Sequence, residues 1–222
     1  MDKILKDLQY KLSREYLESE GKLSVKFAAI AEILLKKVAI KKGNDLYYIT
    51  DIEFYWFSNS HRDIITYPRN TKAGEWFFHM SGVDIAFESW VKTEKAWLYD
   101  KNILTPDAKF GGVLIRGIKP VTDGKPLDVK QLNDHPKNIC EKLFDQFDAF
   151  GNQDGVPRLV VMEHTGELSK PDKRHNIDGK KPLEERVRQL MKNYKDSYLR
   201  PEELYDVFQK SIDFPYRYTI KQ

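Results

Sequence analysis

The first forty residues carry apolar side chains at helical spacing. Between residues 2 and 19 they recur every three or four positions, which predicts one amphipathic helix. A second stripe from residue 27 to 34 predicts another helix, with Ser24 as its N-cap. The polar turn at residues 41–45 (KKGND) then leads into a predicted β-hairpin.

The middle of the chain changes to the alternation typical of β-strands. In residues 46–57 (LYYITDIEFYWF) the side chains of Asp51, Glu53 and Tyr55 share one face, and apolar side chains occupy the other. Further strands are predicted at residues 76–80, 83–87 and 111–118, and the polar segment 58–73 is expected to be a loop. Arg116 lies inside the last apolar run. It needs a partner or a solvent-filled cleft, because an unpaired buried charge is costly.

Helical spacing returns in the second half, at residues 137–149 and 183–194, and Pro201 suits the first position of a further helix. Strands are predicted at residues 158–163 and 216–220. Central strands flanked by helices predict an α+β fold in a single domain, residues 1–222. Within it, residues 1–40 are helical, residues 41–120 form the β core with the candidate site, and residues 121–222 are helical and β.

Composition narrows the class of protein. The 222 residues are 41% hydrophobic and 13% aromatic, which excludes a disordered chain, and a net charge of +3 excludes a strong overall positive field. The single cysteine, Cys140, excludes a disulfide within the chain and a cysteine-based zinc site. No apolar run has the length of a membrane span, and the charged segment MDKILKDLQYKL is unlike a signal peptide. We expect a cytoplasmic monomer without cofactor or membrane contact.

Several short blocks, in order along the chain, resemble the alkyladenine (3-methyladenine) DNA glycosylase family. Residues 51–55 (DIEFY) resemble the family's acid-x-Glu-Ala-Tyr motif, and Pro68-Arg69-Asn70 resembles its Pro-Arg-Asn. Residues 74–82 (GEWFFHMSG) resemble its aromatic strand ending in Tyr-Gly, and residues 113–120 (VLIRGIKP) resemble Val-Leu-Leu-Arg-x-hydrophobic-x-Pro. The tail PYRY resembles its closing Pro-Leu-Arg-Phe.

The resemblance implies a curved antiparallel sheet and a DNA partner whose flipped purine lies between aromatic side chains. By this resemblance Glu53 activates the water that attacks the sugar, Arg116 holds that water, and Tyr55 stacks on the base. His61 would hydrogen-bond near the base or the sugar. The family's wedge tyrosine, which fills the space left by the flipped base, falls at or near Ser81 here.

The residues suggest a glycosidic site without the family as well. Asp51 and Glu53 are two positions apart, roughly 7 Å, and such closeness can raise one carboxyl pKa into the range of a general base. Arg116 can offset one of the charges and orient water. The expected substrate-binding residues are Tyr55, Asp51, Arg69, Asn70, His79 and Asp84.

Each of these residues also has a structural interpretation. Two acids on one strand are commonly a solvated face, and an arginine in an apolar strand is commonly half of an ion pair. Arg69 and Asn70 can brace a loop. A metal site formed by Glu53, His61, His79 and Asp84 is a further alternative, which no metal-binding spacing supports.

A basic segment is the expected phosphate contact. Residues 170–200 hold ten Lys and Arg against five acids, and the candidates are Arg186, Arg188, Lys192 and Lys195. The same segment can equally be a solvated loop and helix face. Three functions stay open: hydrolysis of the N-glycosidic bond of a modified base in DNA, binding of nucleic acid or nucleotide without hydrolysis, and hydrolysis of small nucleosides.

Overall fold

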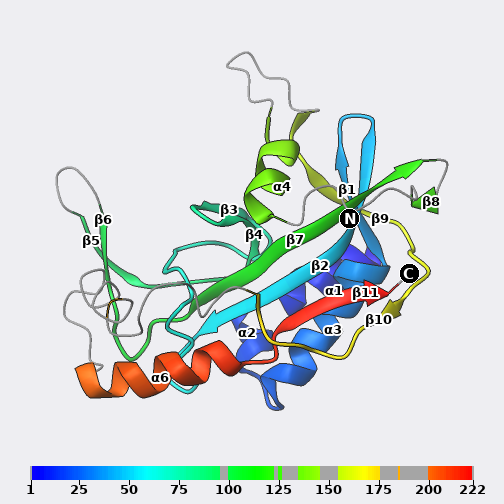
Figure 1. Ribbon diagram of the computed structural model, residues 1–222. Helices are drawn as coiled ribbons and strands as arrows, with labels where there is room; N and C mark the ends of the chain where they lie inside the picture. The colour runs from blue at the N-terminus through cyan, green and yellow to red at the C-terminus, as the bar shows by residue number, and fades with distance from the viewer. Residues whose placement is uncertain are drawn as a thin grey trace.

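The computed structural model describes residues 2–95, 100–122, 125–126, 135–145, 155–175, 185 and 200–221. In these residues the fold is α+β, as expected, with one curled antiparallel sheet and helices from both ends of the chain (Figure 1). No helix in this part of the chain is both long and apolar enough to cross a membrane.

The first helical segment is divided into two helices, α1 (Lys3–Lys11) and α2 (Arg14–Glu18). The division falls at Ser13, whose hydroxyl accepts a hydrogen bond from the Tyr16 amide at 3.2 Å and so caps α2. The helix α3 (Leu23–Lys36) begins at Leu23 without a side-chain cap, so the prediction of Ser24 as its N-cap is wrong.

The sheet is built around the long pair β2 and β7. Its strand order is β10-β11-β2-β7-β4-β3; β1 pairs with β2 and β9, and β8 with β7. A separate hairpin is formed by β5 and β6. The strands are β1 (Val38–Lys42), β2 (Asp45–Phe57), β3 (Trp76–His79), β4 (Gly82–Ala86), β5 (Lys92–Lys95), β6 (Asp100–Ile103), β7 (Phe110–Thr122), β8 (Lys125–Pro126), β9 (Arg158–Val161), β10 (Glu167–Leu168) and β11 (Arg217–Lys221).

The two faces of β2 have different environments, which confirms the predicted alternation. Ile52, Phe54 and Trp56 belong to the main hydrophobic core, beneath α3, where Phe27 stacks on Phe54 with ring centroids 4.5 Å apart. Glu53 and Tyr55 lie on the opposite face, and the tyrosine hydroxyl donates a hydrogen bond to the Glu53 carboxylate. The sheet therefore buries an apolar face under the first helices and keeps a polar face for other contacts.

Two helices from the second half complete the described structure. The helix α4 (Pro136–Leu143) is shorter than the predicted segment 137–149 and packs near β4 and β7. The helix α6 (Pro201–Asp213) begins at Pro201 as predicted and packs through Leu204 and Phe208 on a second apolar cluster. The helix predicted at residues 183–194 lies outside the described residues, except for Glu185.

Candidate functional site

A cavity of about 400 Å³ opens on the polar face of the sheet. Its walls come from β2, β4, β7, the loop after β2, the β3–β4 hairpin, the start of α4 and the segment before residue 176. The lining residues are Tyr55, Ile65, Tyr67, Arg69, His79, Met80, Ser81, Asp84, Leu114, Arg116, His135, Pro136 and His175. Five of the residues predicted from sequence are thus brought to one place: Tyr55, Arg69, His79, Asp84 and Arg116.

Glu53 lies beneath this cavity with no exposed surface, and its carboxylate is bound by three residues that line the cavity, Tyr55, Arg116 and His175. The Tyr55 hydroxyl donates to Oε2 at 2.8 Å, and the His175 backbone N–H donates to Oε1 at 2.5 Å. Arg116 places Nη1 3.5 Å from Oε2 and Nε 3.3 Å from Oε1. Arg116 therefore has the partner that its position in an apolar strand required.

Tyr55 keeps its proton in this arrangement. Burial and the neighbouring Glu53 carboxylate hold the Tyr55 pKa well above its ordinary value, against the opposing effect of Arg174. The tyrosine is therefore a fixed hydrogen-bond donor to Glu53.

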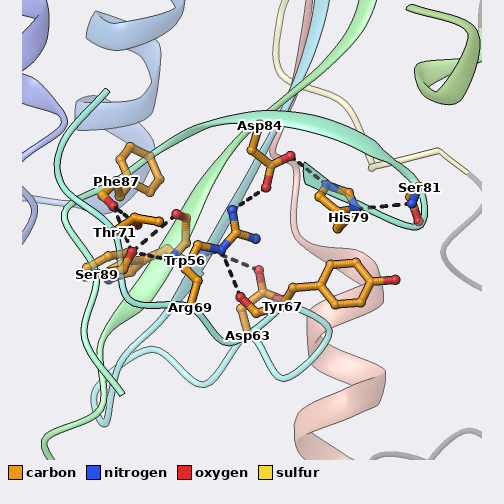
Figure 2. A network of polar contacts seen from close by, with 11 residues as sticks. Trp56, Asp63, Tyr67, Arg69, Thr71, His79, Ser81, Asp84, Phe87 and Ser89 are labelled. Atoms are coloured by element: carbon orange, nitrogen blue, oxygen red, sulfur yellow. Dashed lines mark hydrogen bonds and ion pairs between the residues drawn. The ribbon is translucent and has the colours of Figure 1, made fainter. Parts of the chain in front are cut away.

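Asp84 connects two further predicted residues (Figure 2). Its carboxylate accepts from Arg69 Nη1 at 2.5 Å and contacts His79 Nε2 at 2.9 Å. Burial alone would raise the Asp84 pKa, but Arg69 and His79 outweigh it and the pKa is lowered. The Ser81 backbone N–H donates to His79 Nδ1 at 3.2 Å, so the neutral imidazole carries its proton on Nε2 and donates a hydrogen bond from there to Asp84.

Arg69 is buried and fixed on three sides. Its guanidinium lies 3.8 Å from the centroid of the Phe77 ring, and Nε donates to the Tyr67 carbonyl at 3.0 Å. Gly112 leaves the space that Arg69 occupies, because a Cβ atom at that position would lie 2.9 Å from Arg69 Nη1. Arg69 and Asp84 thus form a rigid wall of the cavity.

Asp51 does not join this group, and the prediction of a shared Asp51–Glu53 carboxylate site is wrong. Asp51 is bound by Arg217, whose Nη2 lies 2.7 Å from Oδ2 and whose Nε lies 3.1 Å from Oδ1. Each carboxylate has its own arginine, Arg217 for Asp51 and Arg116 for Glu53, and Asp51 does not line the cavity.

His61 and Asn70 also lie away from the cavity. His61 packs against Phe214 with ring centroids 4.6 Å apart, and its Nε2 is 3.4 Å from the Tyr216 hydroxyl. Burial lowers the His61 pKa, with Asp63 opposing the shift. Asn70 donates to the Val91 carbonyl at 3.1 Å and accepts from the Val91 amide at 2.7 Å, which is the loop-bracing alternative.

Sequence reasoning missed a buried ion pair beside the site. Arg174 Nη1 and Nη2 lie 2.6 and 3.0 Å from the two Asp63 oxygens, with both side chains fully buried. Burial disfavours the Arg174 charge, but Asp63 outweighs it and raises the Arg174 pKa. The guanidinium also lies 4.6 Å from the centroid of the Tyr55 ring. Arg174 lies in the basic segment whose pattern indicates a phosphate contact or a solvated surface, and nothing in that pattern predicts its burial.

Residues 169–175, here called the strap, bring His175 to the site. The Ser169 amide donates to the Thr219 carbonyl at 2.8 Å, and Asp172 exchanges two backbone hydrogen bonds with Arg217, at 2.9 and 3.0 Å. Arg174 then anchors the strap in the interior, and the His175 amide reaches Glu53. A backbone donor carries no residue signature, so this contact could not be predicted.

The remaining candidate residues do not add to the site. Among the described residues, no group of three or more His, Cys, Asp or Glu could hold a metal ion, so Glu53, His61, His79 and Asp84 do not form the alternative metal site. The phosphate candidates Arg186, Arg188, Lys192 and Lys195 lie outside the residues that the structure describes.

Comparison with known proteins found no match to a protein-family model, to a curated protein or to a solved structure. The function is therefore inferred from the chemistry of the cavity and of Glu53 beneath it.

Proposed function

We propose that this protein hydrolyses the N-glycosidic bond of a modified or damaged base in DNA, with Glu53 as the residue that activates water. The observation that carries the proposal is the buried Glu53 carboxylate, held by Arg116 and Tyr55 directly beneath a cavity of about 400 Å³. That volume is within the range of small-molecule pockets. A fixed carboxylate can both activate water and stabilise the positive charge that develops on the sugar.

The cavity walls suit a flat ring. Tyr55 and Tyr67 line the cavity, and Tyr67 is 42% exposed. The Tyr67 ring lies against His79, as Figure 2 shows. The ring centroids are 4.8 Å apart, and this contact limits the freedom of the Tyr67 ring to turn. Stacking of a base on an aromatic side chain contributes about 1–3 kcal/mol.

Met80 supports a role for the β3–β4 hairpin in extracting the base. Its side chain is 91% exposed at the tip of this hairpin, next to Ser81, and it also lines the cavity. Proteins that unstack DNA insert apolar side chains, methionine among them, between base steps. Met80 is therefore our candidate for the wedge, in place of the family's tyrosine.

Water must reach Glu53 for this chemistry. The Glu53 side chain has no exposed surface, so a nucleophilic water reaches it only if a group packed against it moves, such as the His175 N–H at Oε1 or the Tyr55 hydroxyl at Oε2. The backbone contact from the strap is the one whose removal leaves the Glu53–Arg116–Tyr55 group intact. The reaction therefore requires His175 to move away from Glu53.

A second candidate function is base binding without hydrolysis. Tyr55, Arg116 and His175 all bind the Glu53 carboxylate, and this favours the second candidate. A carboxylate held in this way can fix the positions of its neighbours without activating water. In that case Glu53 positions the cavity wall and contacts no water.

The experiment is release of free base from DNA containing alkylated, deaminated or hypermodified bases, detected by mass spectrometry. We expect release by the wild type and a loss of about 100-fold or more in Glu53→Gln, as is typical when a general base is removed. Asp51→Asn is the matched control: it makes the same carboxylate-to-amide change on the same strand face, away from the cavity. Equal release by Glu53→Gln and the wild type would show the mechanism to be wrong. Base binding without release would favour the second candidate.

A further inference from the structure

The hydrogen-bonding state of each side chain in the cavity limits what the cavity can recognise. The Asp84 carboxylate gives one oxygen to Arg69 and the other to His79. Both His79 nitrogens are engaged, one with Asp84 and one with the Ser81 amide. Each oxygen of the carboxylates nearest to the cavity thus already has a cationic or donor partner, and their negative charges are offset by Arg69 and Arg116.

Two nitrogen atoms of the cavity remain as hydrogen-bond donors to a ligand and cannot act as acceptors. Arg116 turns Nε and Nη1 toward Glu53, where Nε is buried without a hydrogen-bond partner among the described residues, and Nη2 is the guanidinium nitrogen left for a ligand in the cavity that Arg116 lines. His135 accepts a hydrogen bond at Nδ1 from the Lys137 amide at 3.3 Å, as the N-cap of α4. The neutral His135 ring therefore carries its proton on Nε2, which makes that nitrogen a donor.

The other polar groups of the cavity do not discriminate between ligands. The hydroxyls of Tyr67 and Ser81 can rotate to donate or to accept, and no contact with a described residue fixes the His175 imidazole. Selectivity therefore depends on the fixed donors, Arg116 Nη2 and His135 Nε2.

We infer that Arg116 and His135 select a neutral base carrying exocyclic oxygen over its amino counterpart and over a positively charged N-alkylated base. This inference rests on the proposed function, because it takes the ligand to be a nucleobase. An oxo group accepts a hydrogen bond from either donor, whereas an amino group places a donor against a donor and leaves both unpaired. A cationic base meets Arg69 and Arg116 with no free carboxylate to offset its charge.

The test is to measure the binding of free bases to the whole chain by titration calorimetry or NMR. Two matched pairs exchange an oxo group for an amino group, and with it the adjacent ring N–H for an unprotonated ring nitrogen: hypoxanthine against adenine, and uracil against cytosine. We expect the oxo member to bind at least about tenfold more tightly in the pair that fits the cavity, since an unpaired polar contact costs about 1–3 kcal/mol. Equal or tighter binding of the amino members, or no binding of any of the four bases to folded protein, would overturn the inference.

His135→Asn is the decisive variant. Asparagine is a good N-cap, so it keeps the Lys137 contact of α4 while it removes the imidazole donor. We expect it to weaken binding of the oxo base about three- to tenfold and to leave the amino base unchanged. An unchanged affinity for the oxo base in this variant would exclude His135 as a selecting residue.

A second arm separates this inference from the proposed function. Oligonucleotides containing deoxyinosine or cationic 7-methylguanine are incubated with the wild type, and the released base is measured. Binding of oxo bases without any release would contradict hydrolysis and uphold the ligand class. Release of 7-methylguanine in preference to hypoxanthine would uphold hydrolysis and contradict the ligand class.

Discussion

His164 links the stability of the protein to pH through a single buried ring. It is 5% exposed, stacks on Tyr48 with centroids 4.3 Å apart, and places Nδ1 3.3 Å from the Leu35 carbonyl. Burial lowers the His164 pKa below its ordinary 6.5; the Leu35 carbonyl opposes this shift and Lys119 adds to it. The folded protein therefore favours the neutral ring.

The sign of the pH dependence follows from this shift. Because the unfolded chain takes up the proton first, the stability that neutral His164 provides is present above pH 6.5 and is lost as the pH falls through the folded pKa. We expect the free energy of unfolding of the wild type to fall between pH 7 and pH 5, and His164→Phe to reduce that fall. Urea unfolding at several pH values measures it. An identical pH slope in both proteins would contradict the prediction, and His135→Asn serves as a control at an exposed histidine.

At this scale the sequence predicts the direction of a side chain better than its partner. Alternation placed Glu53 and Tyr55 on the polar face, and the cost of an unpaired charge required a partner for Arg116. The alternation could not show that Asp51 forms an ion pair with Arg217, 166 residues further along the chain, and therefore does not join the site. Such a pairing depends on strand order, which no local pattern contains.

The strap depends on one buried arginine. Removing the charge of Arg174 leaves Asp63 buried without its cation, so we expect Arg174→Met to lower the free energy of unfolding by about 3–5 kcal/mol. The neighbouring Lys173→Met is the control, because its ion pair with Asp213 is exposed and screened by solvent, so its loss changes stability little. Denaturant unfolding compares the two variants.

The double variant Asp63→Leu/Arg174→Met tests the cause of that loss. Removing both charges leaves no unpaired carboxylate, so we expect it to recover part of the stability lost in Arg174→Met. A double variant that is less stable than Arg174→Met would show that the hydrogen bond that Asp63 accepts from the Trp56 amide matters more than its unpaired charge.

The β3–β4 hairpin gives a prediction that separates duplex from single-stranded DNA. If Met80 inserts between base steps, Met80→Ser lowers base release from duplex DNA by about tenfold or more, because unstacking costs a few kcal/mol. Release from single-stranded DNA, where less unstacking is needed, changes little. Val25→Ser is the control, an equally drastic change at a 66% exposed residue on α3, which lies on the helical face. Equal loss on both substrates would contradict the wedge role.

Element boundaries show where local patterns are insufficient. The apolar stripe of residues 2–19 continues across two helices, and only the hydrogen bond of Ser13 reveals where the second begins. The apolar stripe shows which side of each helix faces the core, and this side is the same in both helices. Pro201 predicted the start of α6 correctly, because a missing amide and a fixed φ act at the residue itself.

For the whole molecule, the α+β class could be predicted because central strands and flanking helices are visible as a change of period. The curled sheet was expected only from the resemblance to a known family, and the sheet itself confirms the antiparallel arrangement. The cavity could be predicted only in part. Its floor comes from strands whose alternation is readable, while His135, His175 and Tyr67 reach it from segments with no regular pattern.

The position of β11 beside β2 has a consequence for how the protein is made. The edge of β2 at residues 51–53 pairs with Arg217, Tyr218 and Thr219, and β11 ends 164 residues after β2. At 5–20 residues per second, a ribosome needs roughly 10–30 seconds to supply that partner. During this interval a strand rich in aromatic side chains has an unpaired edge, which is open to pairing with other chains. A high expression level therefore favours aggregation, and Glu53 acquires its surroundings only after His175 has been synthesised.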